Sequence, residues 1–216
     1  QNVGVSDPEC LSGQGGAIHA SGSGITLAGV TLVRNRCETG ALDTGCAGGA
    51  VSLTGRGPSI SAASAVAGTE DGGAVFDDCL FEGNEARGAA TSSIYSGAGQ
   101  GGATAIRFAL PTFTGCNFTG NAAEGGGGAA PATGGAVLLF LSRGDADGGG
   151  DGAESPTFVN CTFAGNRAGA GGTAWRSRTQ GHGIGGALAA IASSPLLTGC
   201  SFTNNTAVAL FPSSAG

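Results

Sequence analysis

The feature that most constrains the fold is the motif Cys-x-Phe-x-x-Asn, which occurs four times along the chain. The copies begin at Cys79, Cys116, Cys161 and Cys200, and a fifth, degenerate copy runs from Val30 to Asn35. A second element, Gly-Gly-Ala followed by an apolar residue, recurs around Gly15, Gly49, Gly134 and Gly185, and two variants occur at Gly72 and Gly101. Two motifs that recur in turn along a whole chain are typical of a solenoid, in which each repeat forms one layer of a stack.

The copy around Phe118 indicates how one repeat is built. Phe113, Cys116 and Phe118 are apolar, whereas Asn117 and Thr119 on either side of Phe118 are polar. Such alternation is typical of a strand with one buried face. Equivalent positions, stacked in parallel about 4.8 Å apart, should form rows that face the interior. The expected rows are Phe81, Phe118, Phe163 and Phe202, and the cysteine ladder Cys79, Cys116, Cys161 and Cys200.

An asparagine closes each copy, and its regular recurrence indicates a structural role. These residues, the Asn ladder, are Asn35, Asn84, Asn121, Asn166 and Asn205. Asn tolerates the left-handed conformation, and its side chain can bond backbone groups of the turn and of the neighbouring layers. We therefore expect a ladder of turn residues and not a catalytic site.

The sequence thus predicts an all-β protein, a right-handed single-stranded parallel β-helix of about five coils. One coil would consist of a Gly-Gly-Ala bend with its strand, a Phe/Cys strand and an Asn turn. The approximate coils are 15–45, 46–100, 101–133, 134–184 and 185–207. They form one domain over residues 1–216, which we expect to be a module of a larger protein, with inserted loops at 54–71, 87–100, 142–155 and 169–184.

The paired motifs Gly-Gly-Ala-[Ile/Leu/Val] and Phe-x-x-Asn resemble the repeats of the polymorphic outer-membrane protein family, known from chlamydial autotransporter adhesins. The resemblance covers about residues 15–207 and depends on two motifs that agree in alternation and order. It implies a right-handed parallel β-helix, exposure outside the cell, and a role in adhesion or surface architecture.

Composition narrows the partners and the location. The chain has no Lys, and its net charge of −6 argues against nucleic acid and anionic membrane surfaces, which attract basic patches. The longest apolar run, at 136–141, is far shorter than the roughly 20 residues that span a bilayer, so this segment should not insert into a membrane. Seven cysteines favour an oxidising location, outside the cell or on its surface.

The cysteines divide into two groups. Cys37 and Cys46 lie off the ladder on one connection and are the pair most expected to form a disulfide, which leaves Cys10 unpaired. Within the ladder, Cys79–Cys116 and Cys161–Cys200 disulfides are geometrically allowed. Buried reduced thiols that pack as small apolar groups are the alternative, and the sequence does not decide between them.

Two sets of residues are candidates for a ligand or a modification. Asp145, Asp147 and Asp151 lie in a Gly-rich acidic loop and offer hard oxygen ligands for Ca²⁺, although a solvated acidic loop is the simpler interpretation. No other cofactor is expected. Asn117, Asn160 and Asn204 begin N-glycosylation triplets, and Asn117 should face outward by alternation.

A further candidate is an aromatic residue with basic neighbours in the loop at 169–184. Trp175, Arg176 and Arg178 could form a contact patch for a protein or a glycan. The alternative is that Trp175 covers the loop against the stack, and the two interpretations are equally compatible with the sequence.

The most economical interpretation is a non-catalytic, extracellular structural or adhesive module that acts in surface, filament or wall assembly and contacts proteins or glycans. A polysaccharide lyase or glycosidase is the alternative, but it needs clustered carboxylates on an outward face, where Asp77 and Asp78 are the only acidic pair. Ice binding is a third interpretation, and Val33, Leu80 and Glu82 interrupt the flat hydroxyl array that it needs.

The two ends of so short a stack should expose strand edges. Residues 1–11 and 207–216 look too short and irregular to act as caps. We therefore predict that the ends pack against other chains or further repeats.

Overall fold

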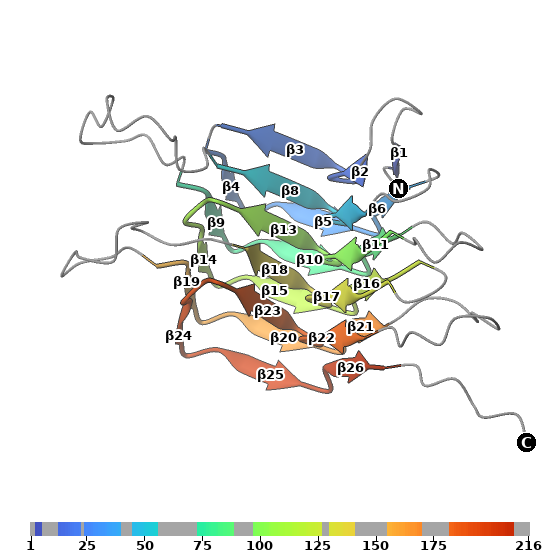
Figure 1. Ribbon diagram of the computed structural model, residues 1–216. Helices are drawn as coiled ribbons and strands as arrows, with labels where there is room; N and C mark the ends of the chain where they lie inside the picture. The colour runs from blue at the N-terminus through green and yellow to red at the C-terminus, as the bar shows by residue number, and fades with distance from the viewer. Residues whose placement is uncertain are drawn as a thin grey trace, which may run out of the picture.

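The computed structural model describes residues 3–5, 13–22, 24–39, 45–55, 73–88, 97–126, 130–140, 155–169 and 182–209. In these ranges the chain forms short parallel strands and no helix, and the strands stack into five sheets along one axis. Figure 1 shows the stack from the side, with the N-terminal coil at the top and the C-terminal coil at the bottom.

Sheet B has the shortest strands, of two residues each, whereas the strands of sheet A have three, as in sheets D and E. Sheet A has six strands: β1 (Val3–Val5), β6 (Arg36–Glu38), β11 (Glu85–Arg87), β16 (Ala122–Glu124), β21 (Arg167–Gly169) and β26 (Thr206–Val208). Sheet B has five strands: β2 (Gly13–Gln14), β7 (Cys46–Ala47), β12 (Gly99–Gln100), β17 (Ala132–Thr133) and β22 (Gly183–Ile184).

The other three sheets enclose the main core. Sheet C contains β3 (Ile18–Ser21), β8 (Val51–Thr54), β13 (Thr104–Arg107), β18 (Val137–Phe140) and β23 (Leu188–Ile191). Sheet D contains β4 (Thr26–Ala28), β9 (Val75–Asp77), β14 (Thr112–Thr114), β19 (Thr157–Val159) and β24 (Leu196–Thr198). Sheet E contains β5 (Thr31–Val33), β10 (Leu80–Glu82), β15 (Asn117–Thr119), β20 (Thr162–Ala164) and β25 (Ser201–Thr203).

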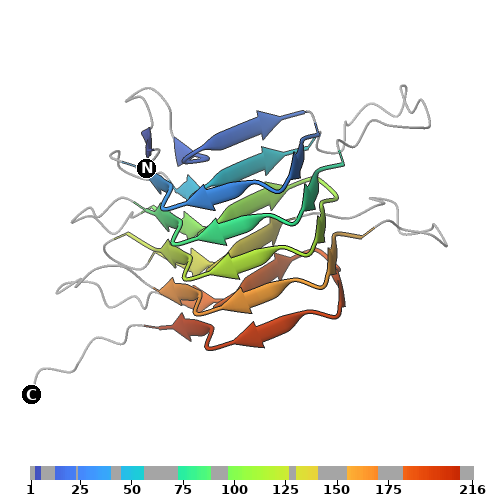
Figure 2. The same ribbon diagram turned by 180° about the vertical axis from the view of Figure 1, so that it is seen from behind.

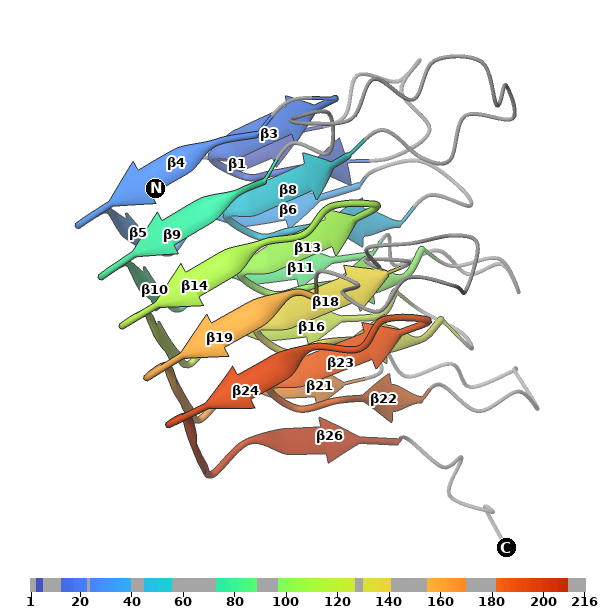
Figure 3. The same ribbon diagram turned by 90° about the vertical axis from the view of Figure 1, so that its left-hand side faces the viewer.

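The predicted parallel β-helix of about five coils is confirmed. The chain passes along sheet C at the front of Figure 1, sheet D at the left and sheet E at the back while it descends, which makes the coil right-handed. In Figure 2, seen from behind, sheet E is in front, and its strands run in the direction opposite to those of sheet C behind it. Figure 3 shows sheet D face on.

Each coil contains five strands, whereas the sequence predicted two. A left-handed corner divides the predicted Phe/Cys strand between sheets D and E, and the short strands of sheets A and B follow the predicted Asn turn. Between sheets D and E the corner residues are Gly29, Asp78, Gly115, Asn160 and Gly199, and all have φ between 47° and 64°. Between sheets E and A they are Arg34, Gly83, Gly120, Gly165 and Asn204, with φ between 52° and 63°. Gly, Asn and Asp, which tolerate this conformation best, supply nine of the ten, and Arg34 is the exception.

The Gly-Gly-Ala element forms the corner between sheets B and C, and each of its positions has its own requirement. The first glycine is left-handed, as at Gly48, where φ is 73°. The second glycine has no room for a side chain, because a Cβ at Gly49 would lie 2.0 Å from the carbonyl oxygen of Gly102 in the next coil. The alanine that follows, Ala50, is fully buried in the core. The copy at 72–74 differs, since Ala74 leads directly into β9 of sheet D.

Stacked phenylalanine rings fill the core between sheets C, D and E. Phe76, Phe113 and Phe158 of sheet D stack with ring centroids 4.3 and 4.8 Å apart. Phe81, Phe118, Phe163 and Phe202 of sheet E stack at 4.7, 4.8 and 4.7 Å. These spacings are close to the distance between neighbouring strands, so the parallel register itself brings the rings into contact.

Candidate functional site

The Asn ladder is a directed chain of hydrogen bonds. The Oδ1 of Asn121 accepts bonds from the backbone N–H and the Nδ2 of Asn84 at 3.0 and 2.9 Å. The same pair of bonds links Asn35 to Asn84, Asn121 to Asn166 and Asn166 to Asn205. Each ladder asparagine thus donates to the coil that follows it and accepts from the coil before it.

The ladder residues are not themselves in the left-handed conformation, which the sequence had assigned to them as turn residues. The residue before each of them is left-handed instead, for example Gly120 before Asn121. The side chain of Asn121 also donates from Nδ2 to the carbonyl oxygen of Phe81 at 3.0 Å. Because Asn84, Asn121 and Asn166 are fully buried, this network satisfies polar groups that water cannot reach.

At the C-terminal end the ladder stops with unused donors. Asn205 donates from Nδ2 to the carbonyl oxygen of Phe163 at 2.8 Å and accepts the two bonds from Asn166. Its backbone N–H, which in every coil above reaches the next Oδ1, has no hydrogen-bond partner among the residues that the structure describes. The other end of the ladder presents the opposite group, since no described residue donates to the Oδ1 of Asn35.

The last coil also exposes apolar side chains that are buried in the coils above. Phe202 stacks on Phe163 but is 46% exposed, whereas Phe163 is fully buried. Leu197 occupies the inward row of Phe158 and is 41% exposed. At the C-terminal end, residues of a core layer are therefore exposed beside the free edges of β22 to β26 (Figure 1). We call this surface the C-terminal face; it consists of Leu197, Phe202, Asn205 and the five strand edges.

The N-terminal end is different, because one strand edge there is occupied. β1 pairs in parallel with β6, with Val3 opposite Arg36 and Val5 opposite Glu38. The expectation that residues 1–11 would supply no cap is therefore wrong for sheet A. The edges of β2, β3, β4 and β5 lie at the end of their sheets.

The predicted disulfide between Cys37 and Cys46 is formed, and both residues are fully buried between sheets A and B. The cysteine ladder, by contrast, consists of free thiols, so the Cys79–Cys116 and Cys161–Cys200 disulfides are absent from the described structure. Each ladder thiol contacts a carbonyl oxygen of the preceding coil, as Cys116 does with Phe76 at 3.4 Å. Hydrogen bonding with Cys161 and burial raise the pKa of Cys116, which keeps this thiol protonated.

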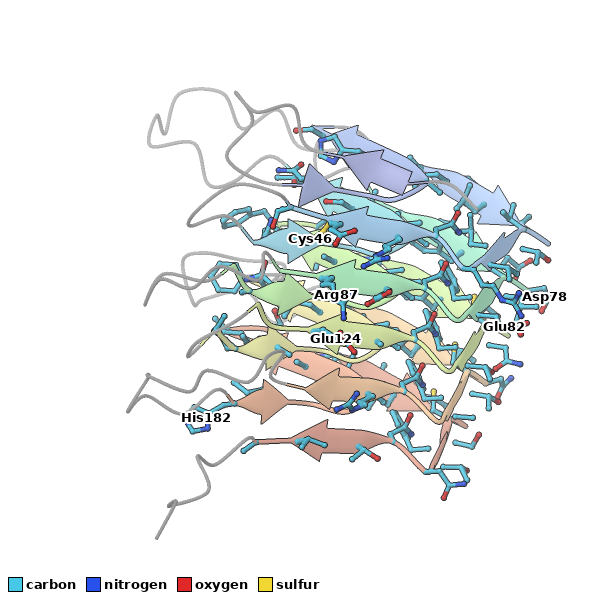
Figure 4. All side chains as sticks on the ribbon, turned by 90° about the vertical axis from the view of Figure 1, so that its right-hand side faces the viewer. Cys46, Asp78, Glu82, Arg87, Glu124 and His182 are labelled. Carbon is cyan, nitrogen blue, oxygen red and sulfur yellow. A yellow bond between two sulfur atoms is a disulfide. The ribbon has the colours of Figure 1, made fainter. Side chains whose placement is uncertain are left out.

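A row of alternating charges on the outer face of sheet A was missed by the sequence interpretation. The ion pairs, by nitrogen–oxygen distance, are Arg36–Glu38 at 3.2 Å, Arg36–Glu85 at 3.5 Å, Arg87–Glu85 at 3.6 Å, Arg87–Glu124 at 3.0 Å and Arg167–Glu124 at 3.7 Å. Figure 4 shows Arg87 and Glu124 on this face in adjacent coils. The sequence contains a signal for this row, because the charged residues lie one or three positions after the ladder asparagines.

The predicted glycosylation residues all have exposed side chains. Asn117 faces outward on β15 and accepts a bond from the hydroxyl of Thr119 at 2.9 Å. Asn160 and Asn204 occupy the left-handed corners before Cys161 and Asn205. Exposure makes the three positions accessible, and their modification stays a prediction.

The outward side chains of sheets D and E bear on the enzyme and ice-binding alternatives. The acidic residues there are Asp77, Asp78 and Glu82, and all three are exposed. Thr31, Leu80, Asn117, Thr162 and Ser201 form one outward row of sheet E, which contains hydroxyls but is interrupted by Leu80. Among the described residues, no ion pair brings a basic side chain onto Asp77, Asp78 or Glu82.

Several predicted sites lie outside the described residues. These are the calcium candidates Asp145, Asp147 and Asp151, the contact candidates Trp175, Arg176 and Arg178, and Cys10. Within the described ranges, no three or more His, Cys, Asp or Glu side chains are grouped so as to hold a metal ion. The same ranges contain no helix of the length and apolarity that crossing a bilayer requires.

Comparison of the chain with protein-family models, with curated proteins and with solved structures gives no match. The resemblance to the polymorphic outer-membrane repeats therefore depends on the repeat residues alone.

Proposed function

We propose that this chain is a non-catalytic, extracellular structural or adhesive β-helix module that assembles with other protein chains or repeats through the ends of its stack. The observation that carries the proposal is the C-terminal face, on which Phe202 and Leu197 are exposed at core positions and the N–H of Asn205 is unused. A surface that combines open apolar rows with unpaired strand edges favours association with a further β-layer.

Three other observations bear on the extracellular setting and on the class of partner. The Cys37–Cys46 disulfide is typical of proteins from oxidising compartments. The net charge of −6 and the absence of Lys favour protein or glycan partners over nucleic acid and membrane surfaces. The exposed Asn117 would be compatible with a glycosylated surface in a host that modifies this triplet.

Sedimentation velocity over a range of concentrations tests the proposal directly. We expect the unmodified chain to associate as its concentration rises, and the Phe202→Asp variant to remain monomeric because a charge on the C-terminal face cannot be buried. Val75→Asp is the matched control, since Val75 is 41% exposed on the side of the stack, away from its ends. A chain that stays monomeric at about 100 μM, or equal effects of the two substitutions, would contradict end-to-end docking.

The enzyme alternative makes a different prediction for the same chain. A polysaccharide lyase or glycosidase would release sugar products in a substrate screen, and Asp78→Asn would abolish that release if the Asp77–Asp78 pair were the acid/base group. Ice binding would instead appear as thermal hysteresis in solution. Either result would replace the proposal of a non-catalytic module.

A further inference from the structure

We infer that the C-terminal face binds the N-terminal coil of a second copy of this chain, head to tail and in the register that joins neighbouring coils, and that β1 must leave sheet A for this to happen. The inference rests on the proposed end-to-end docking and names the partner and the element that controls it. Three features of the structure support it.

The first feature is the direction of the Asn ladder. Asn205 ends the ladder with an unused backbone N–H, and Asn35 begins it with an Oδ1 to which no described residue donates. A head-to-tail contact would bring these two groups together and repeat the bonds that link Asn166 to Asn205. A contact between two C-terminal faces would place donors opposite donors, so the ladder selects the heterologous arrangement over the two-fold one.

The second feature is the match between the rows of side chains. In the register of the sheets, Leu197 belongs to the row that begins with Leu27, and Phe202 belongs to the row that begins with Leu32. A second copy in this register would place its Leu32 next to the exposed ring of Phe202. Leu32 is only 7% exposed in the single chain, so what covers it there must move aside for this contact. This contact repeats the one inside the chain, where Phe81 of the second coil lies next to Leu32 of the first.

The third feature is the position of β1. In a head-to-tail contact β26 of one copy would pair with the free edge of β6 in the other, but β1 already holds that edge through Val3, Gly4 and Val5. The two strands cannot occupy the same place, so one of them must leave its sheet, and we assign this role to β1. Since β1 contributes only three residue pairs, it acts as a removable cap, and the apparent affinity is the intrinsic affinity reduced by the fraction of open molecules.

Release of the cap in the 216-residue chain tests the control by β1. Gly4→Pro combined with Val5→Pro removes backbone donors from β1 and disfavours its pairing with β6, whereas Gly4→Ala with Val5→Ala retains these donors. By sedimentation velocity we expect the proline variant to associate with an affinity at least tenfold higher than the alanine control. Circular dichroism must show the same strand content in both variants. An unchanged affinity in a folded proline variant would overturn the role of β1.

Cross-linking tests the arrangement of the two copies. Thr203 and Val33 end the same outward row of sheet E, so Thr203→Cys of one copy should lie next to Val33→Cys of the other. Both variants are made with the Gly4→Pro and Val5→Pro changes and with Cys10→Ala and Cys200→Ala, so that neither of these thiols competes for the reagent. A short bis-maleimide should join Thr203→Cys only to Val33→Cys in a mixture of the two proteins.

The outcomes separate the inference from the proposed function. Cross-linking of Thr203→Cys with itself would show a two-fold contact and overturn the head-to-tail arrangement. Association of the unmodified chain that is sensitive to Phe202→Asp would still support end-to-end docking in that case. If neither the unmodified chain nor the proline variant associates, both the inference and the docking are wrong.

Discussion

Asn121→Ala, in the middle of the Asn ladder, should destabilise the protein far more than a surface asparagine would. The substitution removes the oxygen that accepts from the N–H and the Nδ2 of Asn84, at 3.0 and 2.9 Å. Asn84 is fully buried, so no water replaces the lost acceptor for these two donors. At about 1–3 kcal/mol for each buried donor without a partner, the free energy of unfolding should fall by about 2–6 kcal/mol.

The matched control is Asn205→Ala, which removes the equivalent oxygen from the last rung. Its bonds with Asn166 are only partly buried, so water can replace them, and we expect a loss of about 0.5–1.5 kcal/mol. Equilibrium unfolding in urea, followed by circular dichroism, measures both variants, and equal m-values would show that the same transition is compared. Equal losses for the two variants would refute the idea that burial of the ladder, and not the amide itself, determines its contribution.

Two further predictions concern the cysteines. Replacing both Cys37 and Cys46 by Ser removes a bridge across 9 residues and should lower the free energy of unfolding by about 2.5 kcal/mol. In a thermal-shift assay, a reductant should lower the melting temperature of the unmodified chain but not that of the variant. An unmodified chain whose melting temperature does not respond to the reductant would contradict the prediction. The raised pKa of Cys116 means that this thiol stays protonated in the folded state while the unfolded thiol ionises at about pH 8.5. The stability from this difference is complete below about pH 8.5 and is lost as the pH rises above it, by up to about 1.4 kcal/mol per pH unit. Urea unfolding at several pH values should show this decline in the unmodified chain and a flatter profile in Cys116→Ala, and parallel profiles would count against the assignment.

The coil could be predicted from the repeats because residues at equivalent positions of successive repeats come into contact when the coils stack. Phe118 recurs at the same place in each copy, so a parallel register alone brings it onto Phe81 and Phe163. The corners were harder to predict, although a signal for one of them is present. Phe113 and Cys116 are three residues apart, which an uninterrupted strand cannot place on one face, and Gly115 between them is the left-handed corner.

The features that support the proposed assembly could not be predicted from the sequence, and the reason is physical. All five ladder residues are asparagine, so the sequence does not tell whether each amide oxygen accepts from the preceding or from the following coil. Only the hydrogen bonds reveal that each Oδ1 accepts from the preceding coil, which gives the two ends of the stack opposite chemistry. β1 is equally hidden, since Val3, Gly4 and Val5 carry no motif and form a strand only because the edge of β6 is present to pair with it. The interior of this solenoid thus follows from its repeats, whereas the proposed assembly depends on the two places where the repeat ends.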